Sequence, residues 1–93
     1  MTTRADELAE RAAFLAHTFG DRWSGENGQD NYRLFDRAGR MTIGCDTTGT
    51  VSIILDGRPA LFRHHGPGNR VHLLLESEGT LCKLLGVPAE VSI

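Results

Sequence analysis

Four turn signals recur at intervals of about ten residues and divide most of the chain into short segments. Asp36–Gly39 and Asp46–Gly49 share the pattern Asp-x-x-Gly, which is typical of a type I turn followed by a left-handed glycine. Asp56-Gly57 is a type I′ pair, and Gly66–Asn69 has the composition of a four-residue loop. The signals predict an antiparallel meander of five strands, at about 32–36, 40–46, 50–55, 58–65 and 70–76.

The turns also predict a register, because residues that flank a tight turn pair across it. Phe35 is expected opposite Met41, Cys45 opposite Val51, Leu55 opposite Arg58, and His65 opposite Arg70. One face of the sheet is then apolar: Phe35, Met41, Ile43, Cys45, Val51, Ile53, Leu55, Ala60, Phe62, Val71, Leu73 and Leu75. The other face is mixed: Tyr32, Leu34, Thr42, Gly44, Ser52, Ile54, Leu61, Arg63, His65, Arg70, His72 and Leu74.

Both ends of the chain carry helical signals. Residues 4–19 place Leu8, Ala12, Leu15 and Phe19 on one stripe, Thr3 and Asp6 form an approximate capping box, and Gly20 is a stop. Residues 20–31 predict a loop, residues 78–85 a short helix that Ser77-Glu78 caps and Gly86 ends, and residues 86–93 a tail. Both helices need an apolar surface. The fold expected is therefore a single two-layer α+β domain, residues 1–93, with both helices on the apolar sheet face.

Charge is uneven although the chain of 93 residues has a net charge of only −2. Residues 1–30 sum to −3, whereas residues 57–75 hold three arginines and no acid. In the predicted register Arg63 is opposite His72 and His65 is opposite Arg70, so four cationic or titratable groups meet on the mixed face.

This cluster has several interpretations. A solvated hairpin that keeps the sheet soluble is the plainest one. The functional hypothesis is a protein-binding patch of Arg63, His65, Arg70 and His72 with Tyr32, Leu61 and Leu74, because arginine with apolar neighbours is typical of interface hot spots. Replacing both arginines by Glu is then expected to weaken partner capture and to leave the thermal midpoint nearly unchanged. The alternatives are a homodimer through the mixed face and a nucleic-acid-binding module through the Arg/His hairpin.

Trp23 is the second candidate feature, because it is the chain's single tryptophan and lies in the predicted loop. It either folds back over the edge of the core, which is the favoured interpretation, or serves as a partner anchor. The sequence thus predicts a small protein of inhibitor, immunity or adaptor type that binds a protein partner, with a prokaryotic or phage origin.

No motif of the chain predicts an enzyme, a cofactor or a metal site. Cys45 and Cys82 are far apart and lack a CxxC motif, so buried free thiols are expected. His65 and His72 have no carboxylate or thiol beside them to complete a metal site. The sequence also has no apolar run of membrane-spanning length and no apolar signal-peptide region, so we expect a cytoplasmic protein without membrane contact.

Overall fold

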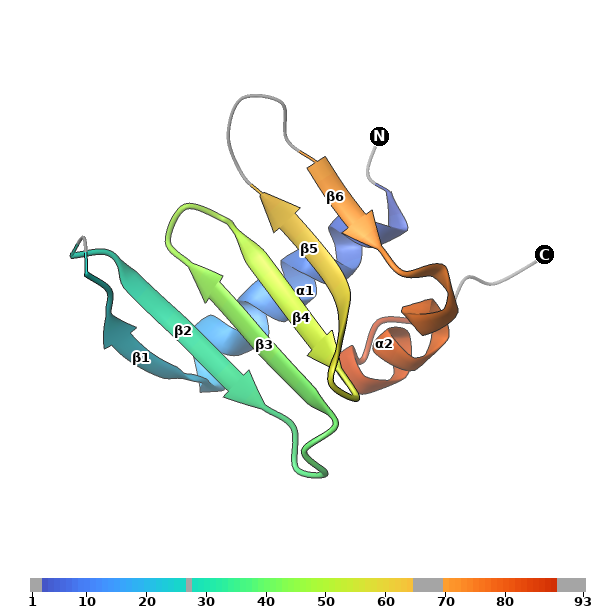
Figure 1. The fold of residues 1–93 in the computed structure, drawn as a ribbon. Helices are drawn as coiled ribbons and strands as arrows, with labels where there is room; N and C mark the ends of the chain where they lie inside the picture. The colour runs from blue at the N-terminus through green and yellow to red at the C-terminus, as the bar shows by residue number, and fades with distance from the viewer. Residues whose placement is uncertain (1–2, 27, 65–69, 89–93) are drawn as a thin grey trace.

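The computed structural model describes residues 3–26, 28–64 and 70–88. It has an α+β architecture in which one face of an antiparallel sheet is crossed by a long helix (Figure 1). The elements in chain order are α1 (Arg4–Phe19), β1 (Asp21–Ser24), β2 (Asp30–Phe35), β3 (Met41–Asp46), β4 (Val51–Leu55), β5 (Arg58–His64), β6 (Arg70–Leu73), the short 3-10 helix η1 (Leu75–Ser77) and α2 (Glu78–Leu85).

Helix α1 begins and ends where its local signals predict. The Thr3 hydroxyl accepts a hydrogen bond from the Asp6 backbone N–H, and the Asp6 side chain accepts one from the Thr3 backbone, which completes a capping box. At the other end a Cβ on Gly20 would lie 2.5 Å from the Ala16 carbonyl oxygen and 2.7 Å from that of Arg33. Gly20 is therefore required because two backbone segments approach each other here.

The sheet has six strands in the order β1-β2-β3-β4-β5-β6, so the predicted count of five was wrong. The additional strand, β1, lies in the segment 20–31 that was expected to be a loop, and it pairs with β2. The tight return near Gly25, whose N–H donates to the Gln29 carbonyl at 2.7 Å, brings β1 back against β2. Strand β1 is exposed along its whole length, so its segment contains few apolar residues. It therefore lacks the alternation of apolar and polar residues that usually indicates a strand.

The strand turns have the backbone geometry that their sequences predict. Gly39 and Gly49 have positive φ, and Asp56 and Gly57 have φ of 51° and 78°, as a type I′ turn requires. The predicted Gly66–Asn69 loop lies outside the described residues. The last strand ends earlier than expected, at Leu73, and the chain then enters η1, where Leu75 is 82% exposed instead of facing the core.

Two of the four predicted registers were wrong by one residue. Phe35 pairs with Thr42 rather than Met41, and Arg70 pairs with His64 rather than His65. The β2–β3 turn contains one residue more than expected, because Met41 lies opposite Asp36: the Asp36 N–H donates to the Met41 carbonyl at 3.0 Å, and the Asp36 carboxylate accepts from the Met41 N–H at 2.8 Å. A slip of one residue turns every side chain of a strand to the opposite face. Tyr32 and Leu34 therefore pack against the core, and Phe35 is exposed.

A β-bulge produces the third difference. Leu55 pairs with Arg58 as predicted, but the register shifts between Ile53 and Ile54, so that Ile53 pairs with Leu61. Ala60 and Leu61 are consecutive and both buried, as at a bulge that turns two side chains to one face. Phe62, predicted in the core, is consequently exposed.

The core lies between α1 and the sheet. Leu8, Ala12 and Ala16 of α1 are buried in it, and α1 contacts every strand (Figure 1). Helix α2 contributes Leu81, Cys82 and Leu85 and packs mainly against α1 and η1, and Gly86 ends it with a left-handed φ of 73°. Ser77 makes no side-chain cap, contrary to expectation, because η1 runs directly into α2. None of the described helices is both long and apolar enough to cross a membrane.

Candidate functional site

The face of the sheet opposite α1 is uncovered by any described element, and we call it the open face (Figure 1). Strand alternation determines which side chains it carries, because Met41, Ile43 and Cys45 point to the core and their neighbours point away. The register across the strands assigns to it Asp21, Trp23, Asn31, Arg33, Phe35, Thr42, Gly44, Asp46, Ser52, Ile54, Pro59, Phe62, His64, Arg70 and His72.

Four large apolar side chains of the open face are exposed. Trp23, Phe35, Ile54 and Phe62 are between 41% and 57% exposed. They come from four different strands, β1, β2, β4 and β5, so they spread across the sheet. At roughly 200 Å² for a fully exposed side chain of this size, they present roughly 350 Å² of apolar surface together. Single exposed apolar side chains are common, but this much apolar area on one face is a feature of binding surfaces.

The β1–β2 end of the open face combines an indole with a guanidinium. The Arg33 guanidinium lies 4.7 Å from the centroid of the Trp23 ring, a cation–π contact between neighbouring strands. Trp23 is thus part of β1 on the open face and does not fold over the core edge, which was the favoured interpretation of the sequence. The stacking fixes the orientation of both side chains while the indole stays half exposed.

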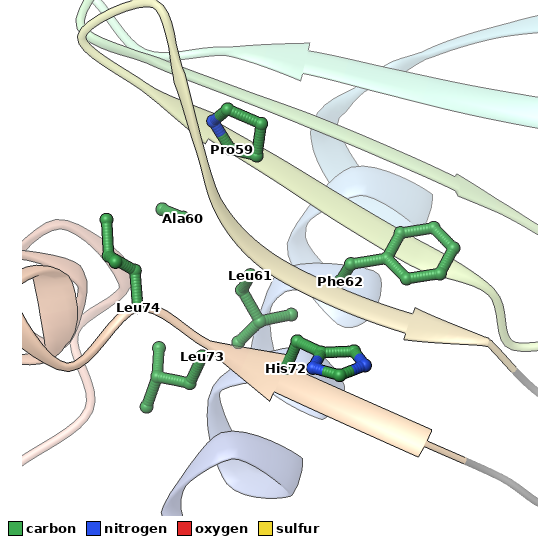
Figure 2. Close-up of a pocket in the computed structure, with 7 residues that line it drawn as sticks. All are labelled: Pro59, Ala60, Leu61, Phe62, His72, Leu73 and Leu74. Atoms are coloured by element: carbon green, nitrogen blue, oxygen red, sulfur yellow. The ribbon is translucent and has the colours of Figure 1, made fainter.

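The β5–β6 end contains a hollow of about 280 Å³, lined by Pro59, Ala60, Leu61, Phe62, His72, Leu73 and Leu74. Figure 2 shows Pro59, Phe62, His72 and Leu74 around the part of β5 that carries Ala60 and Leu61. The bulge accounts for the hollow, because Ala60 and Leu61 both turn to the core and leave the surface between Pro59 and Phe62 without a side chain. Its lining is apolar except for the His72 imidazole, so it suits an aliphatic or aromatic side chain.

Small side chains occupy the centre of the open face. Thr42, Gly44 and Ser52 form the floor of a shallow depression of about 280 Å³ between Phe35 and Ile54. Nothing lies within 4 Å of a Cβ built on Gly44, so the glycine leaves the centre flat. A flat centre between raised aromatic groups is a shape that a second protein surface can cover closely.

The structure separates the predicted patch into two groups. Arg70 and His72 lie on the open face as expected, and Leu74 borders the hollow. Arg63 and Leu61 lie on the covered face because the bulge inverts this part of β5, and Tyr32 lies there because the β2–β3 slip inverts β2. His65 lies outside the described residues.

Arg63 connects the two layers of the fold. Its side chain is only 11% exposed, its Nε donates to the Gly49 carbonyl at 3.0 Å, and its guanidinium pairs with the Glu10 carboxylate of α1. Tyr32 is also held between the layers, with its ring edge to face with His17 of α1 at 4.2 Å. Neither side chain is available to a partner on the open face.

Four open-face residues on which the site depends, Arg33, Phe35, Ile54 and Phe62, were not among the predicted site residues. Phe35 and Phe62 were assigned to the core by a register that was wrong for their strands. Arg33 had no predicted cross-strand partner on the mixed face. The sequence could have indicated Arg33 as a site residue through its pairing with Trp23. That pairing can be predicted only if residues 21–24 are recognised as a strand.

Reactive groups are scarce in the part of the chain that the structure describes. It contains no group of three His, Cys, Asp or Glu side chains able to hold a metal ion. Cys45 and Cys82 are buried free thiols, as expected. Burial, together with the charge of Asp46, raises the pKa of the Cys45 thiol to about 11, so the thiol stays protonated near neutral pH and is a poor nucleophile.

Comparison with protein-family models, with curated proteins and with solved structures finds no match for this chain.

Proposed function

We propose that this protein is a binding module that docks the surface of another folded protein on its open face. The carrying observation is the set of four large, half-exposed apolar side chains, Trp23, Phe35, Ile54 and Phe62, on a sheet face that no described element covers. Aromatic side chains and arginine are the residues in which protein interfaces are enriched. The proposal keeps the kind of function expected from the sequence and replaces most of the predicted contact residues.

The hollow at the bulge provides the anchoring part of the proposed interface. Interfaces concentrate their binding free energy in a few apolar side chains that enter well-packed pockets. A volume of about 280 Å³ is sufficient for one such side chain, and Phe62 and His72 border it from neighbouring strands. We therefore expect the partner to place an aliphatic or aromatic side chain in the hollow, while Trp23 and Phe35 bury their exposed areas at the opposite end of the open face.

Site-specific photocrosslinking in cells of the source organism tests the proposal. A photoreactive phenylalanine derivative is placed at Ile54 on the open face and, as a control, at Thr18, which is exposed on α1. The expected result is a protein adduct from position 54 that is absent from position 18 and is lost when Phe35→Glu is added. The absence of adducts at position 54, or equal adducts from both positions, contradicts the proposal.

A further inference from the structure

We propose that the occupant of the open face is a second copy of this chain, packed face to face about a two-fold axis that runs along the strands between β3 and β4. This inference rests on the proposed function and names the partner of the same surface. A two-fold interface requires that the surface be complementary to itself after rotation. The strand register makes this requirement testable residue by residue.

The register arranges the open face in three rows perpendicular to the strands. The middle row is Asp21, Arg33, Gly44, Ser52, Phe62 and His72, one residue from each strand in sheet order. The row nearest the β2–β3 turn is Phe35, Thr42, Ile54 and Pro59. The third row contains Trp23, Asn31 and Asp46 on one half and His64 and Arg70 on the other.

Rotation about the proposed axis places β1 of one copy opposite β6 of the other, β2 opposite β5, and β3 opposite β4. Each row then faces the same row of the other copy, because the rotation does not move residues along the strands. Phe35 of one copy then faces the Pro59 end of the hollow of the other copy. This places the most exposed aromatic side chain of the open face opposite the apolar hollow at the bulge. Burying a ring in an apolar recess is the strongest single contribution that this surface offers.

The same rotation pairs the polar groups favourably. Asp21 faces His72, so a carboxylate meets an imidazole N–H, and Trp23 faces Arg70, so an indole meets a guanidinium. The centre brings Gly44 opposite Ser52, where small side chains let the two sheets approach.

The distribution of charge favours a second copy over a uniformly acidic or basic partner. Within the described part of the open face the carboxylates, Asp21 and Asp46, lie on β1 and β3. Arg70, His64 and His72 lie on β5 and β6, and Arg33, on β2, is stacked on the Trp23 ring and faces Phe62 of the other copy. A complementary partner must therefore place basic groups opposite β1 and acidic groups opposite β6, and the rotated copy does so.

The size of the face also fits a dimer. Six strands spaced about 4.8 Å apart, with about six residues each rising about 3.4 Å, span roughly 25 by 20 Å, or roughly 500 Å² in projection. The accessible area of side chains exceeds the projected area, and stable interfaces bury roughly 800 Å² per partner. We therefore expect a reversible dimer whose dissociation is visible by dilution in the micromolar range.

Sedimentation equilibrium of the purified chain over a dilution series is the primary test. The expected result is a mass near twice the 10.2 kDa of one chain at high concentration, falling to the monomer on dilution. Phe35→Glu is expected to weaken dimerisation at least about tenfold, whereas Phe14→Glu leaves it unchanged. Phe14 is a matched control because it is 53% exposed, compared with 57% for Phe35, but lies on α1. A monomer at all concentrations, or equal effects of both variants, overturns the inference.

A charge exchange tests the axis itself. Asp21 and His72 lie on opposite edge strands, so they cannot interact within one copy. Asp21→Arg and His72→Asp are each expected to weaken the dimer about tenfold, because Asp21→Arg replaces the acceptor of the imidazole N–H by a hydrogen-bond donor and His72→Asp brings two carboxylates together. The double variant is expected to return to within about threefold of the original affinity. Failure of the double variant to recover, with its circular dichroism unchanged, overturns the proposed axis.

Failure of the dimer and failure of the binding function give different results. If the purified chain is monomeric while position 54 still crosslinks to a different protein in cells, the second copy is wrong and the binding function stands. If neither experiment gives an adduct or a dimer, both proposals are wrong.

Discussion

At the residue scale, Asp46 controls the turn between β3 and β4. Its Oδ1 accepts hydrogen bonds from the Thr48 backbone N–H at 2.8 Å, from the Thr48 hydroxyl at 2.6 Å and from the Thr50 backbone N–H at 3.2 Å. Partial burial raises the pKa of the Asp46 carboxyl, but the hydrogen bonds from Thr48, Gly49 and Thr50 outweigh it and hold the pKa below its ordinary value. The turn is therefore stabilised most when Asp46 is ionised.

This lowered pKa predicts how the stability of the protein depends on pH. A carboxyl whose pKa is lower in the folded state stabilises the fold above its unfolded pKa, about 3.9, and loses that contribution as pH falls through the folded pKa. Asp46→Asn is expected to reduce the free energy of unfolding by about 1 kcal/mol at pH 7, since charged acceptors make the stronger hydrogen bonds. Urea unfolding at pH 7 and pH 3 measures this, and the difference between the two proteins should shrink at pH 3. A difference that is the same at both pH values contradicts this role.

At the scale of elements, the sequence predicted most of the helices and strands and two of the four strand pairings, Cys45 with Val51 and Leu55 with Arg58, and failed on the other two. The caps of α1 and the turns at Asp46 and Asp56 are local, so a few neighbouring residues determine them. Arg40 is bound through its carbonyl and its guanidinium to Asp56 in another turn, and the bulge at Ala60 turns two consecutive side chains into a core formed by distant elements. Interactions between distant residues leave no signal in a local pattern.

Errors in strand register changed the predicted site, because the register determines which side chains lie on the open face. Arg70 and His72 were placed on the correct face because two errors cancel: the bulge shifts β5 by one residue, and the pairing of β5 with β6 differs from the prediction by one residue as well. Arg63 and Phe62 were exchanged between the faces by the bulge, so an expected contact residue became structural and an expected core residue became exposed. One extra residue in the β2–β3 turn and one in the bulge thus changed which side chains β2 and β5 present to the open face.

The two arginines of the predicted patch are now expected to behave differently. Arg63→Glu places a carboxylate beside Glu10 and the Gly49 carbonyl in a mostly buried position, which is expected to cost about 3 kcal/mol of unfolding free energy. Arg70→Glu changes an exposed side chain and is expected to cost less than about 0.5 kcal/mol. Thermal unfolding of each variant, at a concentration that keeps the chain monomeric, checks this. Similar midpoints for the two variants would argue against Arg63 as the link between the layers.

At the scale of the whole molecule, one helix holds the sheet together. The dimensions of 46 × 34 × 22 Å describe a thin molecule, with one sheet and one main helical layer between its faces. Helix α1 contacts all six strands, and its buried residues belong to the same core cluster as those of β3, β4, β5 and α2. The open face adds little to this core, which leaves its apolar side chains free for association without loss of the fold.

A sheet bound to a single helix is expected to unfold as one unit, including its exposed edge strand β1. Trp23 is the only tryptophan and lies on β1, so its fluorescence reports on the edge, whereas far-UV ellipticity reports on the whole chain. The two signals are expected to give the same urea midpoint, because β1 is tied to β2 and to α1 through the close approach at Gly20. Leu8→Ala removes a fully buried side chain of α1 and is expected to reduce the free energy of unfolding by about 3 kcal/mol. Both urea midpoints are therefore expected to fall together. A fluorescence transition at lower urea than the ellipticity transition would mean that β1 unfolds independently and that α1 does not unite all six strands.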